Sequence, residues 1–178
     1  MIRITVPVFF LLFLADLHAQ TNDMIPWRAN RKLTWDDFTK KRDNGPNGLK
    51  ALTTAGIGVE FECNGPEPRI VVKCNFRKKE SWTRTTESDV LLAHEQLHFD
   101  VTELYARKLR QKLSELRDPC GKGASQVQNI YDRNFKDLRA YQSKYDKSTH
   151  HGIKQDIQLI WFHRVDKELN ELESFSSK

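Results

Sequence analysis

The spacing of apolar residues changes near Ser88, and this change does most to limit the folds open to the chain. Before Ser88, apolar residues alternate with small or polar ones, first in residues 57–61 and again in residues 70–76. Two such runs with a Gly/Pro turn between them are typical of an antiparallel hairpin that buries one face. After Ser88, apolar residues recur at intervals of three and four, which is the spacing of one helix face. We therefore expect an α+β fold, in which a small antiparallel sheet is followed by three long helices.

Each of the three helices is predicted from its own apolar stripe. The first begins at the change of spacing and can extend to Arg117, because the turn-forming residues 118–121 end it. Ser125 and Gln128 have the spacing of a capping box and mark the start of the second helix, and the third follows Gly152. The inward-facing positions of the first predicted helix are then Val90, Leu91, His94, Leu97, His98, Val101, Leu104 and Tyr105. Those of the second are Val127, Ile130, Tyr131, Phe135, Leu138 and Tyr141, and those of the third are Ile153, Ile157, Ile160, Trp161, Val165, Leu169 and Leu172.

The chain starts like an exported protein. Arg3 is the first charge, residues 4–14 are almost wholly apolar, and Ala19 offers a small residue for cleavage. This three-part pattern predicts a signal peptide over residues 1–19 and a secreted or periplasmic protein. Residues 20–178 fit one compact domain. No later apolar stretch is long enough to cross a bilayer, so no membrane span is expected.

The charge of the chain does not indicate a nucleic-acid partner. The net charge is +5, but the basic residues are scattered and many stand beside acidic ones. A nucleic-acid surface needs a stripe of positive charge or a recognised binding module. We therefore interpret the charges as a solvated surface and expect no nucleic-acid binding.

Three cysteines, Cys63, Cys74 and Cys120, are available for a disulfide in an exported protein. Cys63 and Cys74 flank the turn-forming residues 64–68, so they are expected to face each other across the hairpin and leave Cys120 unpaired. Spacing alone does not fix the connectivity. A zinc site made of cysteines is not expected, because the chain has no C-x-x-C pair.

The motif that indicates chemistry is His94-Glu95-Gln96-Leu97-His98, an H-E-x-x-H sequence inside the first helical stripe. Residues four apart lie on the same helix face, so His94 and His98 can bind one Zn²⁺. Glu95 lies beside them and can take the proton of a water that the metal activates. The alternative is a helix with two coincidental histidines. His94 and His98 align with Val101 and the rest of the buried face, however, and buried polar groups need partners.

A catalytic zinc usually has three protein ligands. The extended motif H-E-x-x-H-x-x-G-x-x-H is absent, since Val101 and Leu104 replace its glycine and last histidine. The third ligand must therefore come from elsewhere in the chain. The candidates are His150 and His151 at the entry to the third helix, His163 within that helix, and an Asp or Glu from the second or third helix.

Several stretches of the chain resemble a known family. The matching residues are Leu33-Thr34-Trp35-Asp36-Asp37-Phe38, Ser81-Trp82, residues 91–100, Glu103-Leu104-Tyr105-Ala106, Tyr145-Asp146, Thr149, His151-Gly152, Gln155 and Trp161. The chain is similar to an uncharacterised bacterial family of predicted secreted zinc-dependent proteases with a domain of unknown function, family 922. The family's Thr-x-His-Gly motif corresponds to residues 149–152, so the resemblance implies that His151, rather than His150, is the third ligand. The family supplies no substrate.

These observations predict a zincin-like α+β protein that is a secreted zinc metallopeptidase. Zinc is bound by His94, His98 and His151, and Glu95 is the general base for hydrolysis of a peptide (amide) bond in a protein or peptide substrate. Tyr145 is a further candidate, as a hydrogen-bond donor to the tetrahedral intermediate. Two alternatives remain open: a catalytically inactive zinc-bearing binding or scaffold protein of the cell envelope, and a metal-free helical adaptor whose histidines belong to the core.

Overall fold

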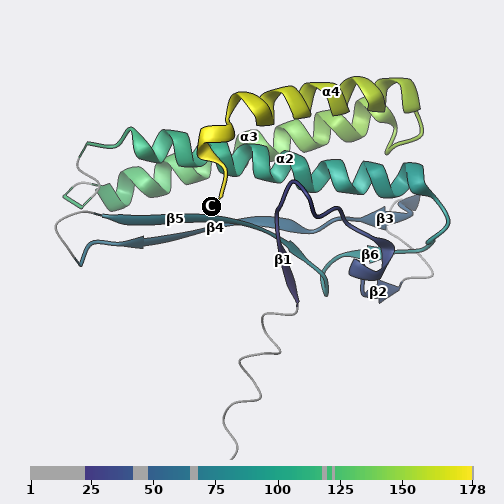
Figure 1. Cartoon of the computed structure of the whole chain (residues 1–178), viewed down its shortest axis with the longest axis horizontal. Helices are drawn as coiled ribbons and strands as arrows, with labels where there is room; N and C mark the ends of the chain where they lie inside the picture. Colours follow the sequence, from purple (N-terminus) through teal and green to yellow (C-terminus); the bar gives the residue numbers. More distant parts are fainter. Residues whose placement is uncertain (1–22, 42–47, 65–67, 118–119, 122, 178) are drawn as a thin grey trace, which may run out of the picture.

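The computed structural model describes residues 23–41, 48–64, 68–117, 120–121 and 123–177. The predicted signal peptide lies outside these residues. The described chain is an α+β fold, as expected, with three helices on one side of two small sheets (Figure 1). No described helix is both long and apolar enough to span a bilayer.

Two three-stranded sheets form the layer below the helices. The first has the order β1-β5-β4 and is wholly antiparallel. The second has the order β2-β6-β3, in which β6 pairs in parallel with β2 and antiparallel with β3. The strand bounds are β1 Met24–Pro26, β2 Lys40–Lys41, β3 Ala51–Leu52, β4 Ala55–Glu62, β5 Arg69–Arg77 and β6 Trp82–Thr83.

The hairpin of β4 and β5 confirms the alternation in the sequence. Ile57 pairs with Cys74 and Val59 with Val72, so these side chains share one face of the sheet. That face packs against the helices, and Phe76 at its end is fully buried. The Phe76 ring lies 5.8 Å from the ring of Phe99 on the helix above, measured between centroids. The apolar side of the hairpin therefore forms the floor of the core.

The first long helix, α2 (Asp89–Ser114), lies between the sheets and the other two helices, α3 (Gly123–Thr149) and α4 (Gln155–Glu171). Every residue from 99 to 107 is buried, which is typical of a helix enclosed on all sides. Ser88 caps its start, since the Ser88 side chain accepts a hydrogen bond from the Leu91 amide. Two one-turn 3₁₀ helices, η1 (Trp35–Asp37) and η3 (Glu173–Phe175), complete the fold.

The ends of two predicted helices, and the burial of some predicted inward-facing residues, differ in the structure. Helix α2 ends at Ser114, three residues before Arg117, and α3 begins at Gly123, two residues before the expected cap Ser125. Some positions of the apolar stripes are exposed, and on α4 the buried apolar residues are limited to Trp161, Val165 and Leu169. The exposed positions are Val90, Phe135, Ile153 and Ile160.

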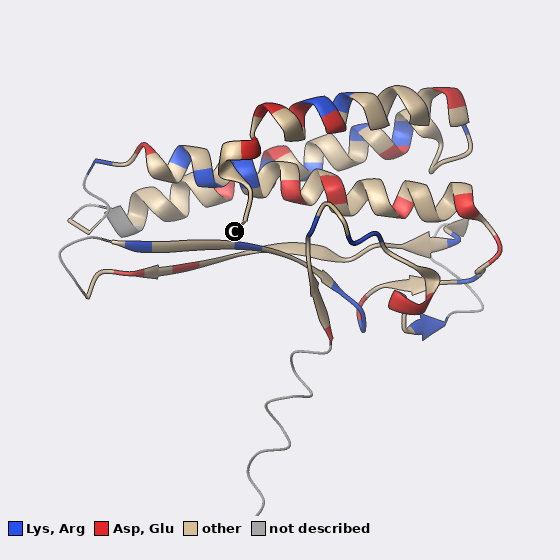
Figure 2. Ribbon diagram, in the orientation of Figure 1, with Lys and Arg blue, Asp and Glu red and all other residues tan. Residues whose placement is uncertain are grey.

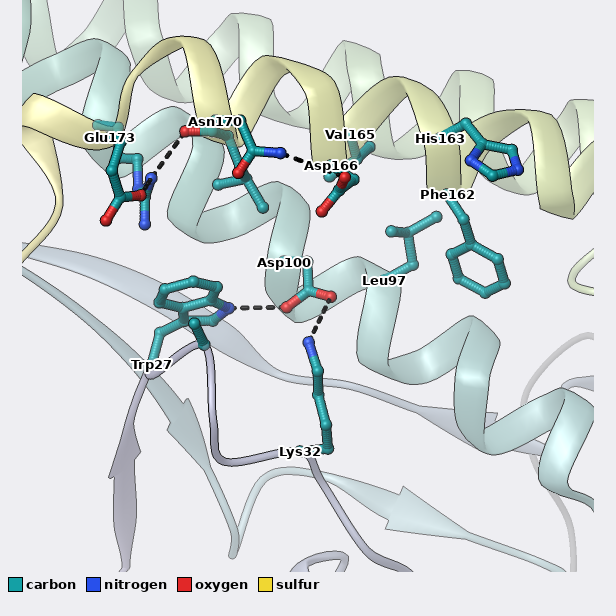
Figure 3. Close-up of a pocket in the computed structure, with 13 residues that line it drawn as sticks. Trp27, Lys32, Leu97, Asp100, Phe162, His163, Val165, Asp166, Asn170 and Glu173 are labelled. Atoms are coloured by element: carbon teal, nitrogen blue, oxygen red, sulfur yellow. Dashed lines mark hydrogen bonds and ion pairs between the residues drawn. The ribbon is translucent and has the colours of Figure 1, made fainter.

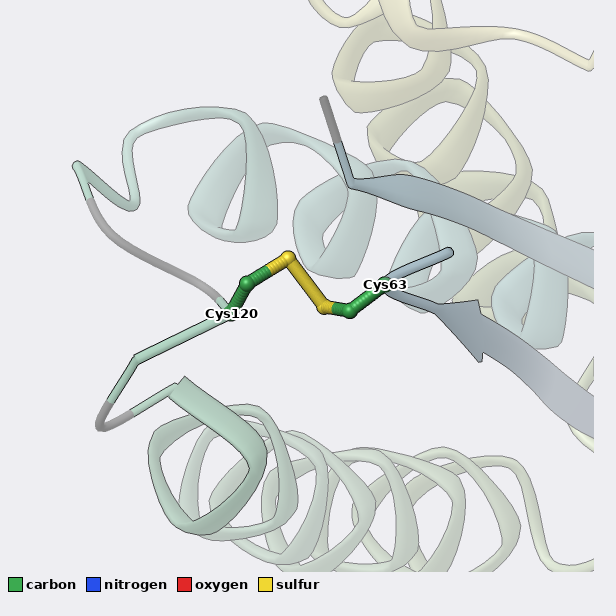
Figure 4. Close-up of a disulfide and its surroundings, with 2 residues drawn as sticks. All are labelled: Cys63 and Cys120. Carbon is green, nitrogen blue, oxygen red and sulfur yellow. A yellow bond between two sulfur atoms is a disulfide. The ribbon is translucent and has the colours of Figure 1, made fainter. Parts of the chain in front are cut away.

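The expected pairing of Cys63 with Cys74 is wrong. Cys63 forms a disulfide with Cys120, with their Cα atoms 5.7 Å apart (Figure 4). The register of the hairpin explains the difference: Cys74 lies opposite Ile57, five residues before the end of β4, and its thiol is buried in the core. Cys63 follows the end of β4, where the segment before α3 passes close by. The disulfide therefore joins the hairpin tip to that segment.

Candidate metal centre

The first turns of α2 bring His94 and His98 to the same side of the helix. Their rings meet edge to face, with centroids 4.7 Å apart. The His94 side chain is 2% exposed and that of His98 is 15% exposed. The two histidines therefore face the interior, as the helical spacing predicted, and His98 lies nearer the solvent.

Asp146, in the last turn of α3, lies against both histidines. Its Oδ1 is 3.2 Å from His94 Nε2 and 2.9 Å from His98 Nε2, and the two Nε2 atoms are 3.2 Å apart. Zinc bonds of about 2.0–2.1 Å in a tetrahedral site place ligand atoms roughly 3.3 Å from one another. The three side chains thus form a group that could hold a metal ion.

Two glutamines set the orientation of the histidine rings. Gln158 of α4 donates through its amide nitrogen to the Val90 carbonyl, so its carbonyl oxygen faces His94 Nδ1 at 3.1 Å. Gln142 of α3 donates to the His98 carbonyl in the same way, and its oxygen contacts His98 Nδ1. Each Nδ1 must therefore be the protonated donor. In the neutral rings this tautomer presents the Nε2 lone pairs to a metal, as metal binding requires. Without a metal, an Nε2 that faces Asp146 donates a hydrogen bond to it only when the ring is protonated.

The charges of the group also suit a cation. Burial alone raises the pKa of Asp146, but the hydrogen bonds of His94 and His98 outweigh it and hold that pKa well below its usual range. Burial alone lowers the pKa of His98, but its hydrogen bond with Asp146 and the charge of Glu95 raise it above its ordinary value. Asp146 is consequently ionised at neutral pH and offers a carboxylate to a metal.

Glu95 lies beside this group and is only 3% exposed. Its Oε2 is buried and has no hydrogen-bond partner in the described part of the chain. Its charge acts on both His98 and Tyr145, whose pKa values it raises. A buried carboxylate oxygen without a partner is costly. Glu95 therefore carries a free acceptor next to the three candidate ligands.

The loop at the end of α3 supports the His94 ring. Gly152 has a φ of 84°, and a Cβ there would lie 3.1 Å from His94 Cβ and Cγ. His150 and His151 have φ values of 51° and 53°, in the left-handed region that residues other than glycine rarely adopt. The backbone amide of His151 donates to the Asp146 carbonyl at 3.0 Å, which ties the loop to the helix end.

His94, His98 and Asp146 are called the metal group below. His151 is close to this group but is not part of it. Its Nδ1 lies 3.4 Å from Asp146 Oδ1, and its side chain is 55% exposed. His150 is exposed, and His163 lies on α4 beside a different cavity. His151 as a ligand therefore stays a prediction, while Asp146 is one of the acidic residues of the second helix that the sequence left open.

Tyr145 packs against His94 and does not line the cleft described below. The two rings stack with centroids 4.6 Å apart. The Tyr145 hydroxyl is 3.3 Å from Gln158 Oε1 and 3.5 Å from the His94 carbonyl oxygen. Burial, together with the charge of Glu95, raises its pKa well above the ordinary value. Tyr145 thus holds the His94 ring in place, and its role as a hydrogen-bond donor to a reaction intermediate stays a prediction.

The metal group opens into a cleft of about 1330 Å³. The cleft is bordered by β3, the start of α2, the end of α3 and the loop through Ile153. A second cavity of about 420 Å³ lies on the opposite face of α2, beneath α4 (Figure 3). There Asp100 accepts hydrogen bonds from Trp27 at 2.7 Å and from Gln96 at 2.8 Å, so its carboxylate is already satisfied. The larger cleft is therefore the candidate site.

Comparison with known proteins gives a family without a known activity. No curated protein and no solved structure matches the chain. One family model matches residues 16–152, which include His94, Glu95, His98 and Asp146. Since the match covers more than half of the chain, the protein belongs to the family described as "Bacterial protein of unknown function (DUF922)".

Proposed function

We propose that this protein is a secreted or periplasmic zinc metallopeptidase with a zincin-like site. In this proposal His94, His98 and Asp146 hold the ion and Glu95 is the general base. The observation that carries the proposal is the meeting of three ligand atoms within 3.2 Å of one another beside the free carboxylate oxygen of Glu95. The predicted ligand His151 competes with Asp146 for the third position.

Each residue of the site has a chemical role in this proposal. A bound zinc ion supplies Lewis acidity, which polarises a carbonyl group and makes water reactive near neutral pH. Glu95 accepts a proton from the attacking water and can return it to the departing amine. Gln142 and Gln158 hold the imidazole rings in the tautomer that presents Nε2 to the metal. Tyr145 and Gly152 restrict the movement of His94 from two sides.

The cleft favours turnover over the alternative, a zinc-bearing binding or scaffold protein of the cell envelope. A structural zinc site is closed by four protein ligands, whereas a catalytic one keeps a position for substrate or water. Here the group of three borders a large cleft, and a carboxylate that is not among the three stands beside it. That combination is expected of a hydrolase.

The decisive test compares wild-type protein with Glu95→Gln. We expect both to contain about one zinc per chain by elemental analysis. The variant should cleave a mixed peptide library roughly 10²- to 10⁴-fold more slowly, because it lacks a general base. Equal cleavage by two proteins of equal zinc content would remove Glu95 from the mechanism. Absence of metal from both would overturn the zinc assignment.

A further inference from the structure

Exposed apolar side chains gather around the candidate site. Among the described residues, seven large apolar side chains are exposed, and four of them line the cleft. These four are Leu52, Val90, Phe135 and Ile153. Scattered apolar residues on a surface need no explanation, but a group that lines a cleft indicates contact with an apolar part of a ligand.

One wall of the cleft is the free edge of a strand. In the second sheet β3 lies at the edge, and residues 51–53 and 55 line the cleft. The Lys50 carbonyl accepts from the Arg84 amide, and the Thr54 carbonyl accepts from the Arg77 amide, so these groups face the sheets. Backbone groups alternate in direction along a strand. The backbone N–H and C=O groups of Ala51, Thr53 and Ala55 therefore face away from the sheets.

This edge is fixed directly to the helix of the metal group. The Thr53 hydroxyl donates to the Glu95 carbonyl oxygen at 3.1 Å. Further along, α3 covers the same edge, since the Tyr131 hydroxyl donates to the Ile57 carbonyl at 3.2 Å. The stretch from Ala51 to Ala55 is thus the part of the edge that borders the cleft, and it passes beside Glu95. A strand edge of this kind can bind an extended peptide by main-chain hydrogen bonds.

Basic residues border the cleft on two sides. On the sheet side, Lys50 and Arg84 stand next to each other where β3 begins and β6 ends, a region with basic residues in blue (Figure 2). On the helix side, Arg139 and Lys147 lie two turns apart on α3. All four are exposed, and none forms an ion pair with a described residue. Apart from Glu95 and Asp146, Glu87 is the one acidic residue among the described lining residues.

We propose that the cleft binds an extended acidic polypeptide, whose main chain pairs with residues 51–55 and whose acidic side chains contact the two basic borders. This inference rests on the proposed function for its chemistry and adds the class of substrate. The apolar residues of the cleft hold a large apolar side chain of the peptide near the metal group. A positive cleft also raises the rate of encounter with an anionic chain.

The test measures binding without cleavage, using the full-length zinc-loaded Glu95→Gln protein and fluorescent peptides. The peptides share one central leucine and carry Glu, Gln or Lys at the same flanking positions. We expect the Glu peptide to bind on the order of tenfold more tightly than the Gln peptide and more tightly still than the Lys peptide. The advantage should shrink as salt is added, because exposed charges are screened.

Matched variants locate the effect on the protein. Arg84→Glu and Arg139→Glu should each remove most of the preference for the Glu peptide. Arg133→Glu makes the same charge change on exposed α3 surface outside the cleft and should leave the preference intact. N-methylation of alternate peptide amides should weaken binding for one set of positions and spare the other, as pairing with a strand edge requires.

The results can separate this inference from the proposed function. Equal affinity for the three peptides would overturn the acidic specificity, and equal weakening by both N-methylated sets would overturn the strand pairing. Competition by inorganic polyphosphate as strong as that by the Glu peptide would show a general anion site instead. If the zinc-loaded wild-type protein binds the Glu peptide selectively but does not cleave it, the cleft assignment is supported and the hydrolase is rejected.

Discussion

Asp146 contacts both histidines of the candidate metal group, and His151 lies just outside that group. Asp146→Ala removes the oxygen that contacts both Nε2 atoms, so zinc affinity should fall by more than about 100-fold, the upper range for residues that only support ligands. His151→Ala should reduce it by less than about tenfold if His151 only neighbours Asp146. Competition with a chelating dye measures both values.

His163→Ala is the control for this comparison. His163 is exposed and lines the second cavity, so its loss should leave zinc affinity unchanged (Figure 3). A steep loss in His151→Ala together with wild-type affinity in Asp146→Ala would show that the family-based prediction of His151 is right and the geometric assignment of Asp146 is wrong.

The glutamines behind the histidines offer a second test at single residues. Gln158→Leu and Gln142→Leu remove the acceptors that fix the ring tautomers, and each should lower zinc affinity about 10- to 100-fold. Gln158→Glu keeps an acceptor for His94 Nδ1 and should bind zinc better than Gln158→Leu. If the leucine and glutamate variants bind zinc equally well, the hydrogen bond to His94 does not position the ring.

At the scale of elements, the loop between α3 and α4 determines whether His94 can keep its place. Gly152→Ala should cost about 1–2 kcal/mol from the left-handed backbone alone. The new methyl group also meets the His94 side chain at 3.1 Å, so zinc affinity should fall as well. Denaturant unfolding and metal titration give the two quantities separately.

Gly48→Ala is a matched control for this loop. Gly48 has a similar φ of 76°, but no atom of the described residues lies within 4 Å of the position of its Cβ. The two variants should lose similar stability, and only Gly152→Ala should lose zinc affinity. An equal loss of zinc affinity in both would mean that backbone strain, rather than contact with His94, is responsible.

Local patterns in the sequence predict the elements of this protein better than its site. The start of the first helix near Ser88, the alternating hairpin and the inward direction of His94 and His98 depend on neighbours a few residues away. Asp146, Gln142 and Gln158 lie 52, 44 and 64 residues from the histidines that they contact, and no short-range pattern relates such positions. The residues alone point no further than to an acidic ligand from the second or third helix, and Asp146 is named only within the Tyr145-Asp146 pair of the family resemblance.

The same limit explains why the predicted pairing of the cysteines is wrong. A turn between Cys63 and Cys74 suggests that they meet, but the hairpin register places Cys74 opposite Ile57. Cys120 reaches Cys63 only because α2 spans the length of the sheet and the chain then turns back into α3 (Figure 1). That route is a property of the packed helices, which spacing along the chain does not contain.

At the scale of the whole molecule, the disulfide and the metal group lie at opposite ends of α2. His94 is in the second turn of this 26-residue helix, whereas Cys120 follows its end. A crosslink between residues 57 apart in sequence stabilises by about 4 kcal/mol when its effect is loss of chain entropy in the unfolded state. Removing it should therefore lower the stability of the protein without altering the geometry around His94.

The double variant Cys63→Ser/Cys120→Ser tests this separation. Its free energy of unfolding should fall by up to about 4 kcal/mol, while the folded protein keeps its zinc affinity, because the group of His94, His98 and Asp146 is built from the other end of the helices. Cys74→Ala is the control: it removes a buried thiol, leaves the disulfide intact and should cost less. Peptide mapping of the oxidised wild type should recover Cys63 joined to Cys120. A Cys63–Cys74 peptide would contradict the hairpin register, and a loss of zinc affinity in the folded double variant would show that the two ends are coupled through α2.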